Sequence, residues 1–177
     1  QHISRWLQCT NWVQGLEGEL DASHTSFLHR SLKTQKEFLP STGSSRPPNY
    51  VFNQAPHIEL KETDYGFIYG ARRSTGCEEY YWRTTQWYLP LFTMIANDEY
   101  PRSGRAWVPV DDYHVMSFNY NYDPENPISD EYREECENGA TFPPRVKQCA
   151  HLLSDGYVID TFIPDANKGN DYFLDRS

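Results

Sequence analysis

The sequence predicts an α+β fold, and three features lead to this prediction. Residues 3–39 read as mostly helical. From His57 onward, short segments rich in Tyr, Trp, Thr and Val alternate with turn-rich breaks, which is typical of antiparallel strands. Between these parts, the stretch from Leu39 to Pro56 is rich in Pro, Ser and Gly, and we expect a surface loop that borders a pocket entrance. Helix first and strands afterwards is an α+β pattern.

The second part of the chain supplies most of the expected elements. Alternating and aromatic-rich segments predict strands over residues 57–60, 64–73, 79–91, 93–96, 106–110 and 113–120. Turn-forming residues predict breaks at Asp111-Asp112 and over residues 123–127. The acidic stretch 129–138 predicts a short exposed helix, whereas residues 143–164 show no clear period.

Composition limits the partners and the cellular setting. The 177 residues carry 16 Lys and Arg against 25 Asp and Glu, a formal net charge of −9, which disfavours nucleic acids and anionic membranes as partners. No apolar run approaches the roughly 20 residues that span a bilayer, and the first residues lack the hydrophobic region of a signal peptide. The four cysteines are irregularly spaced, so we expect reduced thiols and a cytoplasmic location.

The strongest chemical motif is an acid followed by two histidines, Asp21, His24 and His29, in the pattern D-x2-H-x4-H. Two imidazoles and a carboxylate on one face of an ion form the facial triad of non-haem Fe(II) oxygenases. On an ideal helix the two histidines would lie about 140° apart, so they converge on one ion only if the helix is distorted or ends between them. The alternative is that both histidines are ordinary residues on a helix surface.

The residues around this motif resemble a known family. The segment from Gln8 to Arg30 resembles the iron-site segment of Rieske-type aromatic-ring oxygenases, and most of all the phthalate dioxygenase-like branch of their catalytic subunits. Three later segments resemble the same branch in the same order: residues 65–73, 108–112 and 170–176. The resemblance implies a helix-grip (START/Bet v1-like) fold, in which an antiparallel sheet surrounds helices.

The same resemblance assigns roles to the motif. It makes His24 and His29 ligands of a mononuclear Fe(II), and Asp21 the carboxylate that bonds a ligand histidine and links to the Rieske cluster of a neighbouring subunit. A carboxylate in this position fixes the tautomer of a ligating histidine. The plainer alternative for Asp21 is a helix N-terminal charge or cap.

Two departures from the family pattern matter. The cysteines Cys9, Cys77, Cys136 and Cys149 form neither the C-x-H nor the C-x2-H pair of a Rieske domain, so the [2Fe-2S] cluster is expected in the full-length subunit but is not bound by this chain. The family's third iron ligand is an aspartate on a C-terminal helix, which we expect beyond Ser177. We therefore interpret residues 1–177 as a partial catalytic domain without the Rieske domain and the C-terminal helix.

This interpretation predicts how the 177-residue chain behaves alone. We expect exposed apolar sheet surface, weak iron binding and little or no turnover. The pair Asp111-Asp112 would be the substitute third ligand only in a complete chain, and we expect a structural role for it at a strand break.

The resemblance also implies the reaction and the partners. The expected enzyme is an oxidoreductase that inserts oxygen from O2 into an aromatic substrate, by ring dihydroxylation or by hydroxylation with O-demethylation. A reductase using NAD(P)H would supply electrons, and the subunits would form homotrimers or stacked trimers. Several members act on aromatic carboxylates, and a guanidinium clamps a carboxylate well, which makes Arg73 our candidate substrate contact, ahead of Arg72 and Arg83.

Two other functions are alternatives to the oxygenase. A non-catalytic helix-grip domain could hold an apolar or aromatic molecule without metal, although the acid and histidine motif speaks against it. A zinc hydrolase needs a general base close to its ligands, as in H-E-x-x-H, and the sequence has no such arrangement.

Overall fold

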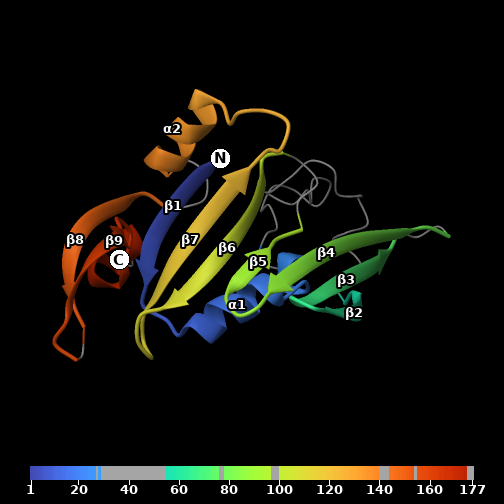
Figure 1. Cartoon of the computed structure of the whole chain (residues 1–177), viewed down its shortest axis with the longest axis horizontal. Coiled ribbons are helices and arrows are strands. Elements are labelled where there is room, and N and C mark those ends of the chain that lie inside the picture. The colour runs from blue at the N-terminus through green and yellow to red at the C-terminus, as the bar shows by residue number, and fades with distance from the viewer. Residues whose placement is uncertain are drawn as a thin grey trace. The chain divides into compact units, whose positions relative to one another are not determined.

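The computed structural model describes residues 1–26, 28, 55–75, 78–96, 100–139, 144–153 and 155–174. These residues form an α+β, helix-grip-like structure that consists mostly of antiparallel sheet with few helices (Figure 1), as the sequence predicted. The seven strands of the main sheet are β1 (His2–Gln8), β2 (His57–Thr63), β3 (Gly66–Ser74), β4 (Tyr80–Tyr88), β5 (Phe92–Met94), β6 (Arg102–Pro109) and β7 (Val115–Tyr122). The remaining elements are the helices α1 (Trp12–Leu20) and α2 (Asp130–Asn138), the 3-10 turns η1 (His24–Ser26) and η3 (Lys168–Phe173), and the strands β8 (Val146–Leu152) and β9 (Val158–Pro164).

The strands of the main sheet follow the order β1-β7-β6-β5-β4-β3-β2, and β8 pairs with β9 in a separate two-stranded sheet. The chain divides into two compact units, one formed by residues 1–15 and 105–177 and the other by residues 16–104. The boundaries fall inside α1 and inside β6.

In the first unit, β1 lies antiparallel to β7, with Ile3 opposite Tyr120 and Trp6 opposite Ser117. The expectation of helix over residues 3–39 is therefore wrong for residues 3–8, which belong to β1. The backbone groups of this segment pair with a strand more than 100 residues away, and no local pattern in the sequence reports such a partner.

Helix α1 begins where Asn11 caps it, because the Asn11 side chain accepts a hydrogen bond from the Val13 amide at 2.9 Å. Its first turn packs closely on the buried Trp107 of β6, and a Cβ atom at Gly15 would lie only 2.4 Å from that indole ring. Glycine at position 15 is therefore what allows the helix to approach the strand this closely.

Strand β7 places unusually polar side chains in the interior of this unit. Every second residue of the strand is buried, and after Val115 these residues are Ser117, Asn119 and Asn121. Within the part of the chain that the structure describes, the Ser117 hydroxyl and the Asn121 side-chain nitrogen have no hydrogen-bond partner. The alternation of side chains along a strand directs these residues inward. Burial of polar atoms without hydrogen bonds lowers the stability of the folded state.

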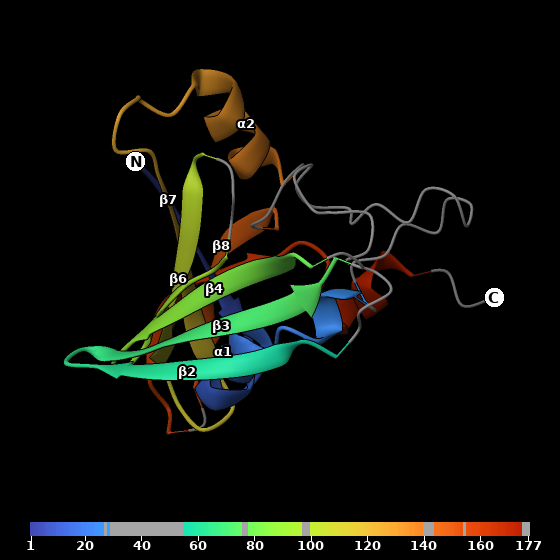
Figure 2. The ribbon, with the colours of Figure 1, turned by 90° about the vertical axis from the view of Figure 1, so that its right-hand side faces the viewer.

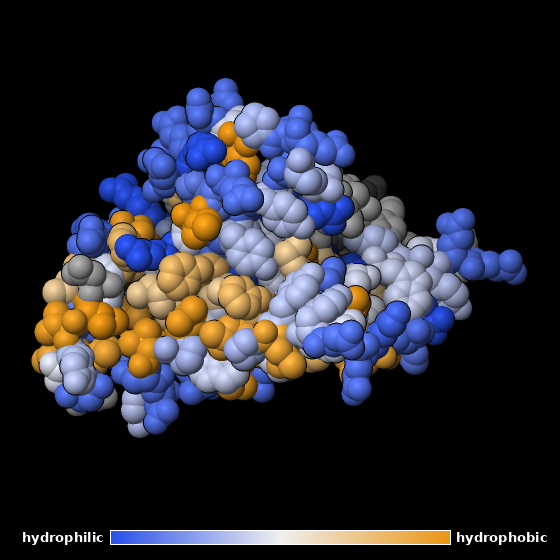
Figure 3. Space-filling model, viewed as in Figure 1, coloured by the Kyte–Doolittle hydropathy of each residue, from blue (hydrophilic) through white to orange (hydrophobic). Residues whose placement is uncertain are grey.

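The first unit also contains α2 and the strands β8 and β9. Helix α2 confirms the predicted short helix: Ser129 caps its N-terminus, and Gly139 ends it in the left-handed region with φ 67°. Residues 143–164, which had no clear period, contain the hairpin of β8 and β9. Hydrophobic side chains gather over this hairpin (Figure 3), where Leu152, Tyr157 and Val158 are exposed.

In the second unit, β2, β3 and β4 lie side by side (Figure 2), and the strands predicted over residues 57–60, 64–73 and 79–91 are confirmed with small shifts of their ends. Tyr69, Ala71 and Arg73 alternate along β3 and are all buried. Thr85 of β4 lies opposite Tyr69, and Arg83 lies opposite Ala71, so all five side chains belong to one face of the sheet.

Candidate metal centre

The predicted iron-binding segment begins where helix α1 ends. The amide of Asp21 still bonds back to the Glu17 carbonyl at 2.9 Å, and the chain then leaves the helix and forms the 3-10 turn η1. Because α1 ends at Leu20, His24 does not lie on this helix. The angle of about 140° between two histidines five positions apart on one helix is therefore no objection that α1 raises.

Asp21 shapes this turn with both carboxylate oxygens. Oδ1 accepts the Ser23 amide at 2.7 Å, and Oδ2 accepts the His24 amide at 3.2 Å. This is the capping geometry considered as the plainer alternative for Asp21. Capping is compatible with the predicted role of Asp21 beside a ligand histidine, because Oδ2 also lies 3.3 Å from Nδ1 of His24.

The arrangement suits a metal-binding histidine. A ligating imidazole usually presents one nitrogen to the ion and the other to a carboxylate, carbonyl or water. In His24, Nδ1 faces Asp21, which places Nε2 on the opposite side of the ring, and the side chain is 26% exposed. The second predicted ligand, His29, lies outside the described residues. The donor set that the structure describes, one imidazole oriented by a carboxylate, fits Fe(II) or another divalent ion that imidazole favours.

The inner face of β3 lies against the same segment. The Tyr69 hydroxyl donates to the Leu20 carbonyl, and burial raises the pKa of this phenol, with the Asp21 carboxylate adding to the shift. The guanidinium of Arg73 is buried and donates from Nη2 to the Ala22 carbonyl at 2.6 Å. The predicted contact of Arg73 with a substrate carboxylate stays a prediction.

The Asp111-Asp112 pair lies between β6 and β7, at the break that the sequence predicted. Asp111 bonds Nδ1 of His114 at 2.9 Å and accepts the Tyr113 amide at 2.8 Å, and the bond from His114 lowers the pKa of the Asp111 carboxyl. Among the described residues, no three His, Cys, Asp or Glu side chains gather in a way that would hold a metal ion.

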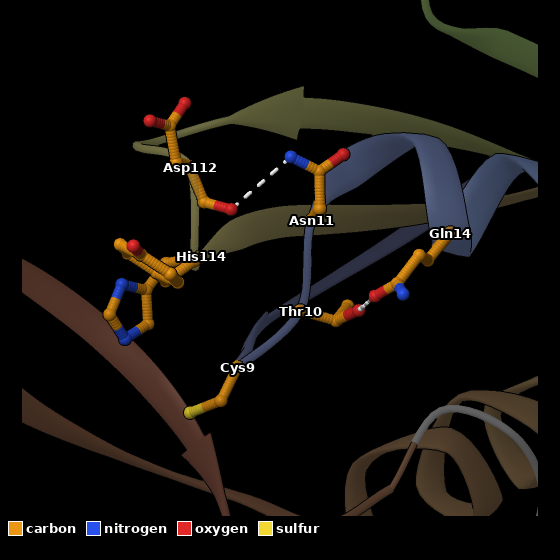
Figure 4. Close-up of a pocket in the computed structure, with 7 residues that line it drawn as sticks. Cys9, Thr10, Asn11, Gln14, Asp112 and His114 are labelled. Carbon is orange, nitrogen blue, oxygen red and sulfur yellow. Dashed lines mark hydrogen bonds between the residues drawn. The ribbon is translucent and has the colours of Figure 1, made fainter.

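Beside this break lies a pocket of about 540 Å³ (Figure 4). It is lined by residues 9–11, 14 and 112–114, and Asn11 bonds the Asp112 carbonyl across it at 3.2 Å. This pocket could not be predicted from the sequence, because its two segments lie about 100 residues apart and no spacing links them. Tyr69 was missed as well; its position four residues before Arg73 on a predicted strand was the signal that both share a face.

No helix in the described part of the chain is long and apolar enough to cross a membrane.

Comparison with known proteins gives one family and several relatives. The family described as LigXa C-terminal domain like matches residues 2–142. The oxygenase subunit of 3-chlorobenzoate-3,4-dioxygenase from Comamonas testosteroni is 34% identical over 115 residues, which cover 64% of this chain and 26% of that protein. The phthalate 4,5-dioxygenase oxygenase subunit of Pseudomonas putida is 27% identical over 185 residues, covering 98% of this chain and 38% of the relative.

A third relative is named for a different substrate class. The oxygenase subunit of the tert-butanol monooxygenase / tert-amyl alcohol desaturase of Aquincola tertiaricarbonis is 30% identical over 138 residues, covering 71% of this chain and 29% of that protein. The chain thus spans between 26% and 38% of the length of these relatives.

These matches confirm the family resemblance that the iron-site segment indicated. The family match covers most of the chain, from the strand before the acid and histidine motif to the end of α2. The chain therefore belongs to the LigXa C-terminal domain-like family, within the oxygenase subunits of Rieske-type aromatic-ring oxygenases.

Proposed function

We propose that this chain provides the mononuclear iron site of an oxygenase that inserts oxygen from O2 into an aromatic substrate. His24 and His29 would hold Fe(II), and Asp21 would orient the His24 ring. The observation that carries the proposal is the contact between Asp21 Oδ2 and His24 Nδ1, in a turn that the same carboxylate caps. A bound Fe(II) supplies the centre at which O2 is activated.

The residues of the chain have two tasks in this function. With Oδ2 at 3.3 Å from Nδ1, Asp21 would accept the Nδ1 proton, which would fix the tautomer of His24 and direct Nε2 to the ion. The same carboxylate is 47% exposed, so it is accessible to a partner. We propose that electrons arrive at this edge from a Rieske [2Fe-2S] cluster of a neighbouring subunit, fed by a reductase that uses NAD(P)H. The oligomer that brings the subunits together would be a homotrimer or a stacked pair of trimers.

The names of the relatives support a proposal for the substrate class. Two of the three are named for aromatic carboxylates, 3-chlorobenzoate and phthalate. We propose an aromatic substrate that carries a carboxylate, converted either by ring dihydroxylation or by hydroxylation with O-demethylation.

The test is metal binding by the 177-residue chain under anaerobic conditions. Fe(II), and Co(II) as a coloured substitute, are titrated into the unmodified chain, the single variants His24→Ala and His29→Ala, and the double variant. The control is His57→Ala, because His57 lies exposed on β2. We expect binding that is lost in the double variant and retained in the control. Equal metal content in the unmodified chain and the double variant would refute the two histidines as ligands and favour a metal-free binding domain.

A further inference from the structure

Two side chains of β3 bond the backbone on the two sides of Asp21. The Tyr69 hydroxyl donates to the carbonyl of Leu20, the residue before Asp21. Nη2 of Arg73 donates to the carbonyl of Ala22, the residue after it, at 2.6 Å. The carboxylate that contacts His24 therefore belongs to a residue whose two neighbours are both bonded to one strand.

The position of these donors follows from strand geometry. Tyr69 and Arg73 are four residues apart on β3, so both point to the same face, and the small, fully buried Ala71 lies between them. Strand β3 pairs with β4 along its whole length, from Gly66 to Ser74, and with β2 on its other edge from Gly66 to Arg72. Tyr69 therefore extends from a part of β3 that is bonded on both edges, and Arg73 extends from the part just beyond it, which is bonded to β4. This sheet gives the turn after α1 a rigid support.

We propose that Tyr69 and Arg73 are positioning residues that hold the backbone on both sides of Asp21 and thereby aim the His24 ring at the metal. This inference rests on the proposed function and adds to it the residues that orient its metal ligand. Neither residue needs to touch the iron, and both act through the bonded carbonyls.

The electrostatics of the site support this role. Burial keeps the pKa of Tyr69 above its ordinary value, so the phenol remains a donor throughout the neutral range. Asp21 itself is half exposed, and an exposed carboxylate alone holds a turn weakly. Anchoring of the adjacent carbonyls restricts the backbone from which both Asp21 and His24 extend.

The geometry also separates this role from the predicted substrate contact of Arg73. The guanidinium is only 1% exposed and donates to a backbone carbonyl of its own chain. A positioning role predicts changes in the protein without substrate, whereas a substrate clamp predicts changes only in substrate affinity.

The test uses the metal-free chain, so that it does not depend on iron binding. The variants are Tyr69→Phe, which removes one oxygen atom, and Arg73→Met, which keeps the length of the side chain without its donors. Matched controls are Tyr65→Phe, an exposed tyrosine stacked on Tyr88, and Arg72→Met, the neighbouring arginine that lies over the Tyr80 ring on the other face.

The first readout is amide hydrogen exchange at Ser23 and His24, whose amides bond to Asp21. We expect exchange to accelerate about ten-fold in each variant, the effect of losing one hydrogen bond, while both controls match the unmodified chain. Protection of the amides that pair β3 with β4 must stay unchanged, which excludes general unfolding. Nitrogen NMR of the His24 ring gives the second readout, and we expect a shift of Nδ1 toward the value of an unbonded ring in both variants.

The conservative variant Arg73→Lys adds a rescue test, because an ammonium can still donate to the Ala22 carbonyl. We expect an exchange rate between those of Arg73→Met and the unmodified chain. Unchanged exchange and ring shifts in Tyr69→Phe and Arg73→Met, with the β3–β4 pairing intact, would overturn the proposal. If the chain binds no metal through His24, the proposed function fails, yet these metal-free measurements still decide whether β3 holds the Asp21 turn.

Discussion

Substitution of Asp21 tests whether its carboxylate only caps a turn or also orients His24. Asp21→Ala removes the acceptors of the Ser23 and His24 amides, at 2.7 and 3.2 Å, together with the contact to His24 Nδ1. Asp21→Asn keeps one amide oxygen for the Ser23 amide, but it replaces the second acceptor by a donor. Comparison of the two variants therefore separates the capping role of Asp21 from its role in orienting His24.

The magnitudes differ between the roles. Loss of a cap costs about 1 kcal/mol, and the exposure of Asp21 places the cost at the lower end of the observed range. In a chain of this size, a loss of about 0.5–1 kcal/mol lowers the Tm by roughly 1–4 °C. Loss of the carboxylate behind a ligating histidine lowers metal affinity by roughly 10–100-fold. We expect Asp21→Ala to show both losses and Asp21→Asn to show mainly the second.

The assay combines thermal unfolding of the metal-free chain with anaerobic Co(II) and Fe(II) titration. Asp123→Asn is the matched control, because Asp123 accepts the Glu125 and Asn126 amides at 2.9 and 3.1 Å in a turn without a histidine. The control is expected to leave metal affinity unchanged. Full metal affinity in Asp21→Asn would show that the carboxylate does not orient His24 and would contradict the proposed role of Asp21 in the metal centre.

Three further predictions concern titration and thiol chemistry. Burial raises the pKa of Tyr69 above 10.0, so above this pH the folded state keeps a proton that the unfolded state loses. The urea midpoint of unfolding should therefore fall as the pH rises above 10.0, and it should fall less steeply in Tyr69→Phe. The bond from His114 lowers the pKa of Asp111 below 3.8, so its stabilisation should be complete above that pH and disappear as pH falls through the lowered pKa. Urea midpoints of Asp111→Asn should lack this acid loss. Burial raises the pKa of the Cys136 thiol, so a coloured disulfide reagent should modify exposed Cys9 at once and Cys136 only after unfolding; rapid reaction of Cys136 in the native chain would contradict its burial.

Most of the sheet was predictable because its strands carry local signals. Strands β3, β4 and β7 alternate or are rich in aromatic and β-branched residues, and the turn at Asp111-Asp112 separates β6 from β7 clearly. Strand β1 was not predictable, since Trp6 and Leu7 are adjacent, both are buried, and the partner strand begins 107 residues after Gln8, at Val115. Burial of neighbouring residues hides the two-residue period that identifies a strand.

The candidate site was predictable only where its parts are close in sequence. His24 follows Asp21 by three positions, and the resemblance of this short segment to the family's iron-site segment predicted that the two interact. The bonds from Tyr69 and Arg73 cross 49 and 51 residues, and a sequence pattern carries no information on which backbone carbonyl a strand side chain will reach. The motif thus predicted the contact between Asp21 and His24, whereas the bonds from Tyr69 and Arg73 became visible only in the structure.

The buried polar residues of β7, which are Ser117, Asn119 and Asn121, lower the stability of the first unit and give its interior groups that can form hydrogen bonds. Among the described residues, the buried Ser117 hydroxyl and the Asn121 amide nitrogen have no hydrogen-bond partner. Their loss of hydration therefore lowers the free energy of unfolding, and no hydrogen bond offsets it. Apolar side chains of similar size at these positions would make the unit more stable and would also remove its capacity to bond anything polar inside. A variant library selected for heat resistance alone should therefore accumulate changes along β7, and the same library selected for function would show whether that interior polarity has a use.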